Sequence, residues 1–344
     1  MKKEPVVKTE GKDPAAHAHR STLLSAPYGK ETTWVIGHRS PDSDAVGSAI
    51  AYAYLLNELG IDAKAAVSGL LNHETQYALK SFGIYSPLVI KKAEGKQFIL
   101  VDHSSYTQAI EGMKKAKVLG ILDHHGIGDI ETTQPINIRS AAVGATATLV
   151  WLSFKETGVE IPQEIARVLL MALLSDTRNM TRNVSGTDRE AFAELVPLAG
   201  IADTDAFYTA MASCLADYGG MTAKEIFLSD YKEYEAAGKK FGISVVRANA
   251  SETIEIMKPQ MQEVMREYLP ESRQDMLYTI FHDRSGGRPH SLVLLAHGEG
   301  AEELLRETFP CEDGKNCILI RQNLSRKTDI VPSLSRKLKE LKYQ

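Results

Sequence analysis

Acidic and imidazole side chains recur in four short segments of the first half of the chain, and together they could bind metal ions. The segments are His38-Arg-Ser-Pro-Asp42-Ser-Asp44, Asp102, Asp123-His124-His125 and Asp176. Carboxylate and imidazole donors without a thiolate suit Mn²⁺ or Mg²⁺ better than a structural zinc ion. Two carboxylates two residues apart, such as Asp42 and Asp44, repel each other unless a cation lies between them. The pattern therefore indicates metal-dependent chemistry.

The donors are numerous enough for two metal ions that share one carboxylate. Two-metal sites typically catalyse hydrolytic phosphoryl transfer. Asp44 could instead cap the helix expected after it, but capping would not explain His38 and Asp42. His124 and His125 could be structural histidines that bind nearby backbone. If the segment is extended, adjacent side chains point in opposite directions, so one imidazole would bind metal and the other would face a substrate.

The apolar pattern supplies elements that bring these side chains to one edge. Strands are expected at 33–37, 62–68, 98–101 and 118–122, with helices at 45–59 and 72–82. Alternating strands and helices predict an α/β fold with a parallel sheet and helices on both faces. Ligands bind beyond the carboxyl ends of such strands, where Asp102 and Asp123 stand. Asp176 ends a helix expected at 162–177, where the helix dipole disfavours an acid and a metal would compensate.

The rest of the chain predicts a second, smaller α/β domain. Helices at 143–157, 187–200 and 204–215 complete the first domain, and Gly219-Gly220 then interrupts the pattern. We expect a disordered or loosely attached tail at 1–30, a catalytic domain at 31–216, a hinge at 217–222 and a second domain at 223–344. The second domain should contain helices at 223–236, 252–269, 300–308 and 331–342, and strands at 242–248, 276–282, 290–296 and 316–321.

Composition disfavours several classes of protein. The 344 residues include 40 basic and 44 acidic side chains, a net charge of −4, so we expect no general attraction to nucleic acid or anionic membranes. We identify neither a signal peptide nor an apolar stretch that could span a bilayer. Three cysteines without a C-x-x-C pair argue against a disulfide scaffold, and we expect a cytoplasmic protein.

A basic segment near the C-terminus, Leu324-Ser325-Arg326-Lys327, follows an apolar strand. Guanidinium forks and ammonium charges suit phosphate groups. A solvated basic loop would explain the segment as well on composition alone, and Lys232 alone would be an ordinary surface lysine on a helix. The metal-binding pattern upstream favours the phosphate interpretation.

In their order along the chain, these motifs resemble the DHH phosphoesterase superfamily and, within it, family II manganese-dependent inorganic pyrophosphatases. They are Gly37-His38-x-x-Pro41-Asp42-x-Asp44, Asp102-His103, Asp123-His124-His125, Val143-Gly144-x-Thr146-Ala147-Thr148, Ser175-Asp176-Thr177, Ser325-Arg326-Lys327 and Val331-Pro332. The resemblance covers residues 33 to 340 or so. It implies an N-terminal DHH domain, a smaller C-terminal domain and an active site in the cleft between them. It also implies hydrolysis of diphosphate to two phosphates by a water or hydroxide that bridges two metal ions.

The resemblance further implies a role for each site residue. His38 and Asp42 would bind one Mn²⁺, Asp44, His124 and Asp176 would bind the second, and Asp102 would bridge the two. His125 would contact the substrate and complete a catalytic set with Asp102 and Asp176. Lys232, Ser325, Arg326 and Lys327 would bind phosphate from the second domain. Asp123 would be left to orient a ligand histidine.

Partners and cofactors follow from the same resemblance. Two Mn²⁺ ions, replaceable by Co²⁺ or Mg²⁺, would occupy the site, and an additional Mg²⁺ would arrive with the diphosphate. The family often forms homodimers through the N-terminal domain, so we expect a homodimer here.

The chain departs from the family pattern beside these residues. Ser104-Ser105 stand where the family commonly has Asn-Glu, Arg178 and Arg182 lie in a segment that is usually more apolar, and Thr328-Asp329 follow the basic motif where a further lysine is usual. A short-chain polyphosphatase or phosphodiesterase of the superfamily is therefore an alternative. His38 opposes the exopolyphosphatase branch, where that position resembles Asn. A non-catalytic phosphate- or nucleotide-sensing module would be expected to have lost a ligand, and none is lost.

Overall fold

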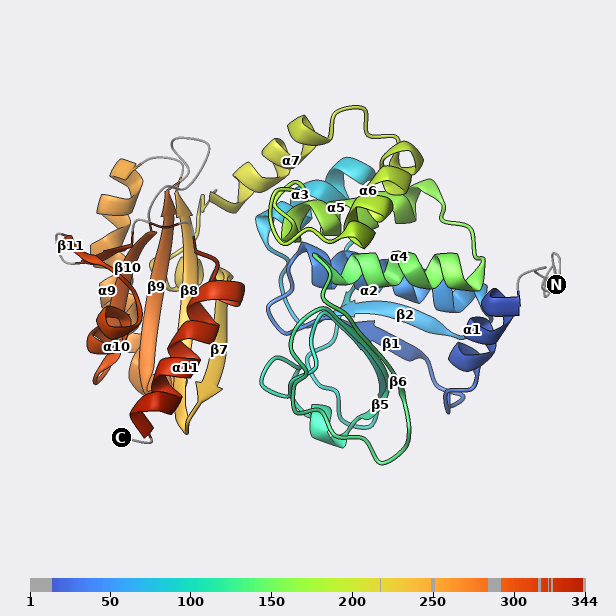
Figure 1. The fold of residues 1–344 in the computed structure, drawn as a ribbon, viewed down its shortest axis with the longest axis horizontal. Helices are drawn as coiled ribbons and strands as arrows, with labels where there is room; N and C mark the ends of the chain where they lie inside the picture. Colours follow the sequence, from blue (N-terminus) through green and yellow to red (C-terminus); the bar gives the residue numbers. More distant parts are fainter. Residues whose placement is uncertain are drawn as a thin grey trace. The chain divides into compact units, whose positions relative to one another are not determined.

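The computed structural model describes residues 14–216, 218–248, 251–283, 292–314, 317–320, 322 and 324–342. Its contacts divide the chain into two compact units, residues 1–71 with 75–209 and residues 72–74 with 210–344. Each unit is built on one six-stranded sheet (Figure 1). The first 13 residues of the predicted tail and Asp217 of the predicted hinge lie outside the described residues.

The first unit contains a parallel sheet with the strand order β3-β2-β1-β4-β5-β6. Its strands are β1 (Thr33–Ile36), β2 (Ala63–Val67), β3 (Leu88–Val89), β4 (Gln97–Val101), β5 (Lys117–Asp123) and β6 (Asn137–Ser140). β4 is buried along its whole length, as expected for a central strand covered on both faces. The order reverses between β1 and β4, and α/β sheets bind ligands at such a point. The predicted α/β class is confirmed.

Helices cover one face of this sheet (Figure 1). α2 (Ser43–Glu58) contacts β1 and β2, and α4 (Thr146–Thr157) contacts β5. α5 (Gln163–Asp176) packs between α2 and α6 (Gly186–Ala199). Two further helices are α3 (His73–Phe82), which follows β2 in the chain, and α7 (Thr204–Ser213), which follows α6. Gly47 allows α2 to approach α5 closely, because a Cβ there would lie 2.5 Å from the carbonyl oxygen of Val168.

The opposite face differs from the prediction of α-helices on both faces. One hydrophobic cluster there joins Phe98 and Leu100 of β4 to Ile110 and to Met113. Met113 begins the short 3-10 helix η1 (Met113–Lys115). Irregular chain and the 3-10 helix η1, both in the connection between β4 and β5, therefore bury this face.

Residues 14–24, expected to belong to a polar tail, form helix α1 (Pro14–Leu24). Leu23 is buried, and His19 Nε2 lies 3.0 Å from a carboxylate oxygen of Glu156 on α4. The amide group of Asn137 on β6 donates to the carbonyl oxygen of Thr22 at 3.3 Å. The tail prediction is wrong for this segment, because tertiary contacts stabilise a helix that lacks a clear apolar stripe.

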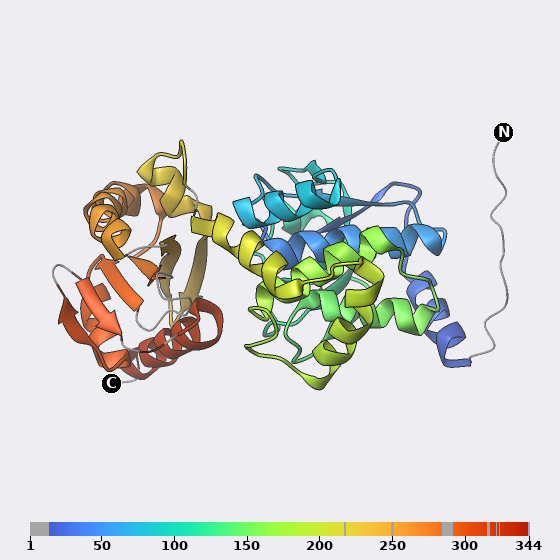
Figure 2. The same cartoon turned by 90° about the horizontal axis from the view of Figure 1, so that it is seen from above.

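The second unit contains a mixed sheet with the order β11-β12-β10-β9-β8-β7. Its strands are β7 (Tyr231–Ala236), β8 (Lys239–Ala248), β9 (Met276–Asp283), β10 (Leu292–His297), β11 (Glu312–Gly314) and β12 (Cys317–Ile320). α8 (Ala223–Ser229) and α9 (Ser251–Ser272) pack on one face, and α10 (Ala301–Thr308) and α11 (Val331–Lys342) on the other. Figure 2 shows orange α9 and red α11 on opposite sides of these strands. The predicted smaller α/β unit is confirmed.

The helix predicted at 223–236 ends at Ser229, and residues 231–236 form β7 instead. β7 pairs with β8 in an antiparallel hairpin. Ala237 and Gly238 join the two strands with φ values of 54° and 83°, the left-handed pair that a tight hairpin requires. Lys232 therefore lies on a strand rather than on a surface helix.

Within the described part of the chain, every helix is too short or too polar to cross a lipid bilayer.

Candidate metal centre

The predicted metal ligands meet at the carboxyl ends of β1, β4 and β5. His38, Asp102 and His124 follow these strands, Asp42 and Asp44 lie at the start of α2, and Asp176 ends α5. Donor atoms lie within 4.8 Å of one another in three groups, which are His38, Asp42 and Asp102, then Asp44, His124 and Asp176, then Asp102, His124 and His125. The structure thus brings all six predicted ligands together in the first unit, with His125 beside them.

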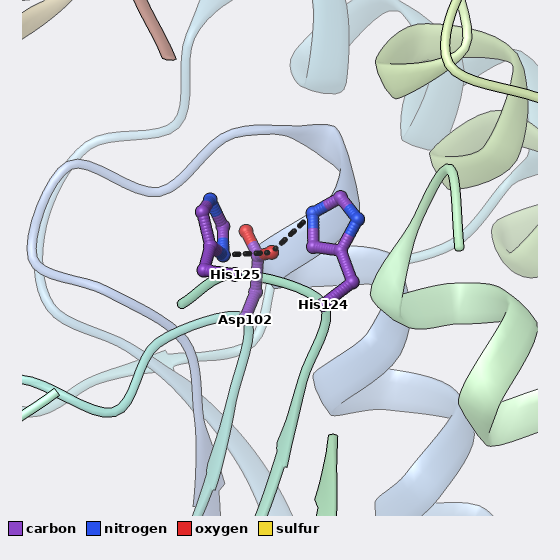
Figure 3. Close-up of side chains that lie close together, drawn as sticks. All are labelled: Asp102, His124 and His125. Carbon is purple, nitrogen blue, oxygen red and sulfur yellow. Dashed lines mark ion pairs between the residues drawn. The ribbon is translucent and has the colours of Figure 1, made fainter. Parts of the chain in front are cut away.

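Asp102 lies at the centre of this set (Figure 3). Its Oδ2 is 3.3 Å from Nε2 of His38, and its Oδ1 is 3.3 Å from Nε2 of His124 and 3.6 Å from Nδ1 of His125. The two oxygens therefore face different imidazoles, as a carboxylate shared by two ions requires. The backbone of Asp102 has a φ of 60°, a left-handed conformation that few non-glycine residues adopt and that often occurs at functional sites.

The other contacts fall into two sets around Asp102. On one side, His38 Nε2 lies 3.1 Å from Oδ2 of Asp42. On the other, His124 Nε2 lies 3.3 Å from Oδ2 of Asp176 and 3.7 Å from Oδ2 of Asp44. These two sets are the two groups of ligands that the family resemblance implies.

Asp42, and not Asp44, caps helix α2. Its Oδ1 accepts the backbone N–H of Ala45 at 3.1 Å. Asp44 is fully buried and instead accepts the backbone N–H groups of Thr146 and Ala147 at 2.6 and 2.9 Å. These N–H groups begin α4, where the helix dipole favours negative charge. The alternative in which Asp44 is only the cap of its own helix is therefore wrong.

The electrostatics of the cluster favour bound cations. Burial, followed by the charges of Asp102 and Asp176, raises the pKa of Asp44 well above its usual range. Carboxylates this close cannot all be ionised without a compensating positive charge. Divalent ions bind the ionised form and would remove this penalty. Oxygen and imidazole donors fit a hard or borderline ion such as Mn²⁺.

Thr146 and Asp188 fix the start of α4 beside the cluster. The hydroxyl of Thr146 donates to Oδ1 of Asp102 at 3.1 Å. Buried Asp188 accepts the N–H of Gly144 at 2.8 Å and the hydroxyl of Thr148 at 2.6 Å, which ties α4 to α6. The sequence did not assign Asp188 a role. Its position three residues after Ser185 could have indicated a role, because the two residues form a capping box at the start of α6.

Asp123 holds His125, contrary to the prediction that it orients a metal ligand. Its Oδ1 lies 2.7 Å from Nδ1 of His125, whereas Nδ1 of His124 lies 3.0 Å from the carbonyl oxygen of Val143. The two imidazoles are 4.6 Å apart between ring centroids, and both approach Asp102 (Figure 3). Strand alternation does not separate them, because β5 ends at Asp123 and the chain bends there.

Cations of the second unit gather around Asp230. Arg326 Nη2 lies 2.6 Å from Oδ1 of Asp230, and Arg247 Nη1 lies 2.8 Å from Oδ2. Burial alone would raise the pKa of Asp230, but the charges of Arg326, Arg247 and Lys232 outweigh burial and lower this pKa to about 2. Asp230 is therefore ionised at neutral pH, and the three cations around it exceed its single negative charge.

Arg247 was not among the residues predicted to form a functional site, although the sequence contained one indication. It is the only charged residue in the apolar run of β8 from Phe241 to Ala248, and a guanidinium in such a partly buried position needs a partner such as Asp230. Two of the other predicted phosphate-binding residues, Ser325 and Lys327, are the chain neighbours of Arg326. Lys327 belongs to the same turn, Arg326–Ile330, and the backbone N–H of Ser325 donates to Asp329 at 2.7 Å.

Comparisons with known proteins match both units. The family described as "DHH family, N-terminal domain" matches residues 32–173, and the "DHHA2 domain" matches residues 209–337. The manganese-dependent inorganic pyrophosphatase of Methanothrix thermoacetophila is 34% identical over 313 residues, which cover 90% of this chain and 99% of that protein. The manganese-dependent inorganic pyrophosphatase of Bacillus subtilis is 33% identical over 309 residues, covering 89% and 98%. A Methanococcus jannaschii structure assigned to the family II inorganic pyrophosphatases matches with a TM-score of 0.80 and 30% identity, covering 89% of this chain and 99% of that one.

We predict that Asp102→Asn lowers the affinity for Mn²⁺ by more than about 100-fold, beyond the usual effect of an outer-shell change. The substitution removes the one negative charge that both groups of donors share. Equilibrium dialysis with Mn²⁺ measures the affinity. Asp62→Asn, which changes an exposed carboxylate just before β2, is the matched control and should bind Mn²⁺ normally. Equal affinity in both variants would contradict the central place of Asp102.

Proposed function

Because the chain belongs to the family of manganese-dependent inorganic pyrophosphatases, we propose that it hydrolyses inorganic diphosphate to two phosphates. The observation that carries this proposal is the complete set of donors around Asp102 in the first unit. A second set of charges, around Asp230, would supply the cations that a substrate with several negative charges needs.

The donor groups would bind two Mn²⁺ ions. His38, Asp42 and Asp102 would bind one, and Asp44, His124 and Asp176, again with Asp102, would bind the other. When bound, the ions would lower the pKa of a water molecule and offset charge on the phosphoryl oxygens. The protein's own contribution is to hold the ligands in place: α4 binds Asp44 through two N–H groups, and Thr146 binds Asp102.

Phosphate would be bound by side chains of both units. With Nδ1 of His125 held by Asp123, Nε2 is the ring atom that would contact a phosphate oxygen. Lys232, Ser325, Arg326 and Lys327 would bind the remaining phosphate oxygens from the second unit. Arg326 is suited to this role because Asp230 already fixes the plane of its guanidinium group, so less side-chain entropy is lost when substrate binds.

Further aspects of this proposal come from the family resemblance and the composition. Co²⁺ and Mg²⁺ share the donor preferences of Mn²⁺, and an additional Mg²⁺ would accompany the diphosphate. We also propose a homodimer formed through the first unit. Three cysteines that form no disulfide among themselves are consistent with a reducing compartment such as the cytoplasm.

The proposal is tested by phosphate release from diphosphate, tripolyphosphate and a dinucleotide, each with Mn²⁺ and with Mg²⁺. We expect diphosphate with Mn²⁺ to have the highest kcat/KM, by about tenfold or more, which corresponds to about 1.4 kcal/mol of transition-state binding. Chelation of the metal should abolish release, and added Mn²⁺ should restore it. Faster release from tripolyphosphate would favour a short-chain polyphosphatase. Tight binding of these ligands without any release would favour a sensing module.

Replacement of Arg326 tests the phosphate-binding role of the second unit. Arg326→Met should raise KM and lower kcat/KM for diphosphate by about 10- to 100-fold, the value of a charge-assisted hydrogen bond. The affinity for Mn²⁺ should not change, because no ligand is removed.

Arg306→Met is the control, since Arg306 pairs with Glu302 on the outer surface of α10. Circular dichroism and thermal unfolding of both variants identify any loss of fold. Normal kinetics in folded Arg326→Met would contradict the assignment.

A further inference from the structure

Ser104 follows Asp102 by two residues, in the loop after β4. Its hydroxyl lies against the loop that carries the two histidines. Ser104 Oγ donates to Oδ2 of Asp123 at 2.9 Å and accepts the backbone N–H of Gly128 at 2.9 Å. A hydroxyl has one proton, and the carboxylate is a stronger acceptor than the carbonyl oxygen of Gly126, which is 3.4 Å away.

Asp123 passes this constraint on to His125. The carboxylate is buried, and each of its oxygens has a partner: Oδ2 binds Ser104, and Oδ1 binds both Nδ1 of His125 at 2.7 Å and the backbone N–H of His125 at 3.0 Å. Hydrogen bonds at both oxygens restrict rotation of the carboxylate, and the bond from Oδ1 to Nδ1 in turn orients the His125 ring. The ligand histidine, His124, is held separately by the carbonyl of Val143.

The loop leaves little room for a larger side chain at position 104. A Cβ on Gly128 would lie 2.2 Å from the carbonyl oxygen of Ser104, so the backbone of the loop packs directly on this residue. An asparagine is longer than serine, and to reach the same carboxylate it would have to displace the segment from Gly126 to Gly128. The close packing of Gly128 on residue 104 therefore suits a side chain as short as serine.

We propose that Ser104 is a positioning residue which, through Asp123, sets the orientation in which His125 meets the substrate phosphate. This inference rests on the proposed function, because His125 acts there as a phosphate contact. Loss of the hydroxyl would free the Asp123 carboxylate to turn and would loosen the imidazole without touching a metal ligand. Small misplacements of a reacting or binding group are enough to slow an enzyme substantially.

The experiment uses the full-length, Mn²⁺-saturated protein with diphosphate. Ser104→Ala should lower kcat/KM by about tenfold, less than the roughly 100-fold that a 1 Å misplacement can cost. Its affinity for Mn²⁺ should not show the roughly 10- to 100-fold loss that follows removal of a ligand's own partner, since the metal ligands keep theirs. Ser104→Thr, which keeps the hydroxyl, should recover most of the activity.

Two further variants separate positioning from a structural effect. Ser105→Ala is the matched control: the Ser105 hydroxyl binds Asp129 and Thr107 in the same loop, and the structure gives it no bond to Asp123, so activity should not change. In a His125→Gln background, Ser104→Ala should cause no further loss, because Ser104 acts through His125.

Each outcome has a definite meaning. If the unchanged protein releases no phosphate from diphosphate, the proposed function fails and this inference fails with it. If the unchanged protein is active and Ser104→Ala has the same kinetics, only the inference is wrong. An equal loss in the His125→Gln background, a parallel loss of Mn²⁺ affinity, or no rescue by Ser104→Thr would show a structural role and would also overturn it.

Discussion

Repulsion among buried carboxylates at the carboxyl edge of the first sheet is the constraint on which the rest of the structure depends. Asp44 and Asp102 are almost completely removed from water, and Asp42 and Asp176 lie in the same cluster. The protein offsets part of this charge with its own groups: the N–H groups of α4 on Asp44, the Thr146 hydroxyl on Asp102, and two imidazoles. Metal ions are the physical means of offsetting the remainder.

The surrounding fold keeps these groups close despite their repulsion. Asp188 ties α4 to α6, and Gly47 lets α2 lie against α5, so the helices that carry Asp44 and Asp176 cannot separate easily. Asp102 and the residues from Arg178 to Met180 adopt left-handed backbone conformations at or just after two of the proposed ligands, Asp102 and Asp176. Each such residue costs on the order of 1–3 kcal/mol, and packing elsewhere must compensate.

Half of the proposed metal ligands could be located from sequence because their positions follow from strand ends. His38, Asp102 and His124 come directly after apolar strands of a parallel sheet, and those ends converge by topology. Features that depend on tertiary contacts could not be predicted in this way. Helix α1 is stabilised by burial of Leu23 and by the contact of His19 with Glu156 on α4. Lys232 lies on β7 because Ala237 and Gly238 form a hairpin turn. Asp123 binds His125 because of a bend that no residue pattern indicated.

The shared role of Asp102 is tested most directly by the number of Mn²⁺ ions bound by each chain, measured by metal analysis after dialysis together with electron paramagnetic resonance. A carboxylate that faces His38 with one oxygen and His124 with the other should link two ions. We expect two Mn²⁺ per chain with the spectrum of a magnetically coupled pair. One ion per chain, or two ions without coupling, would contradict the shared role of Asp102.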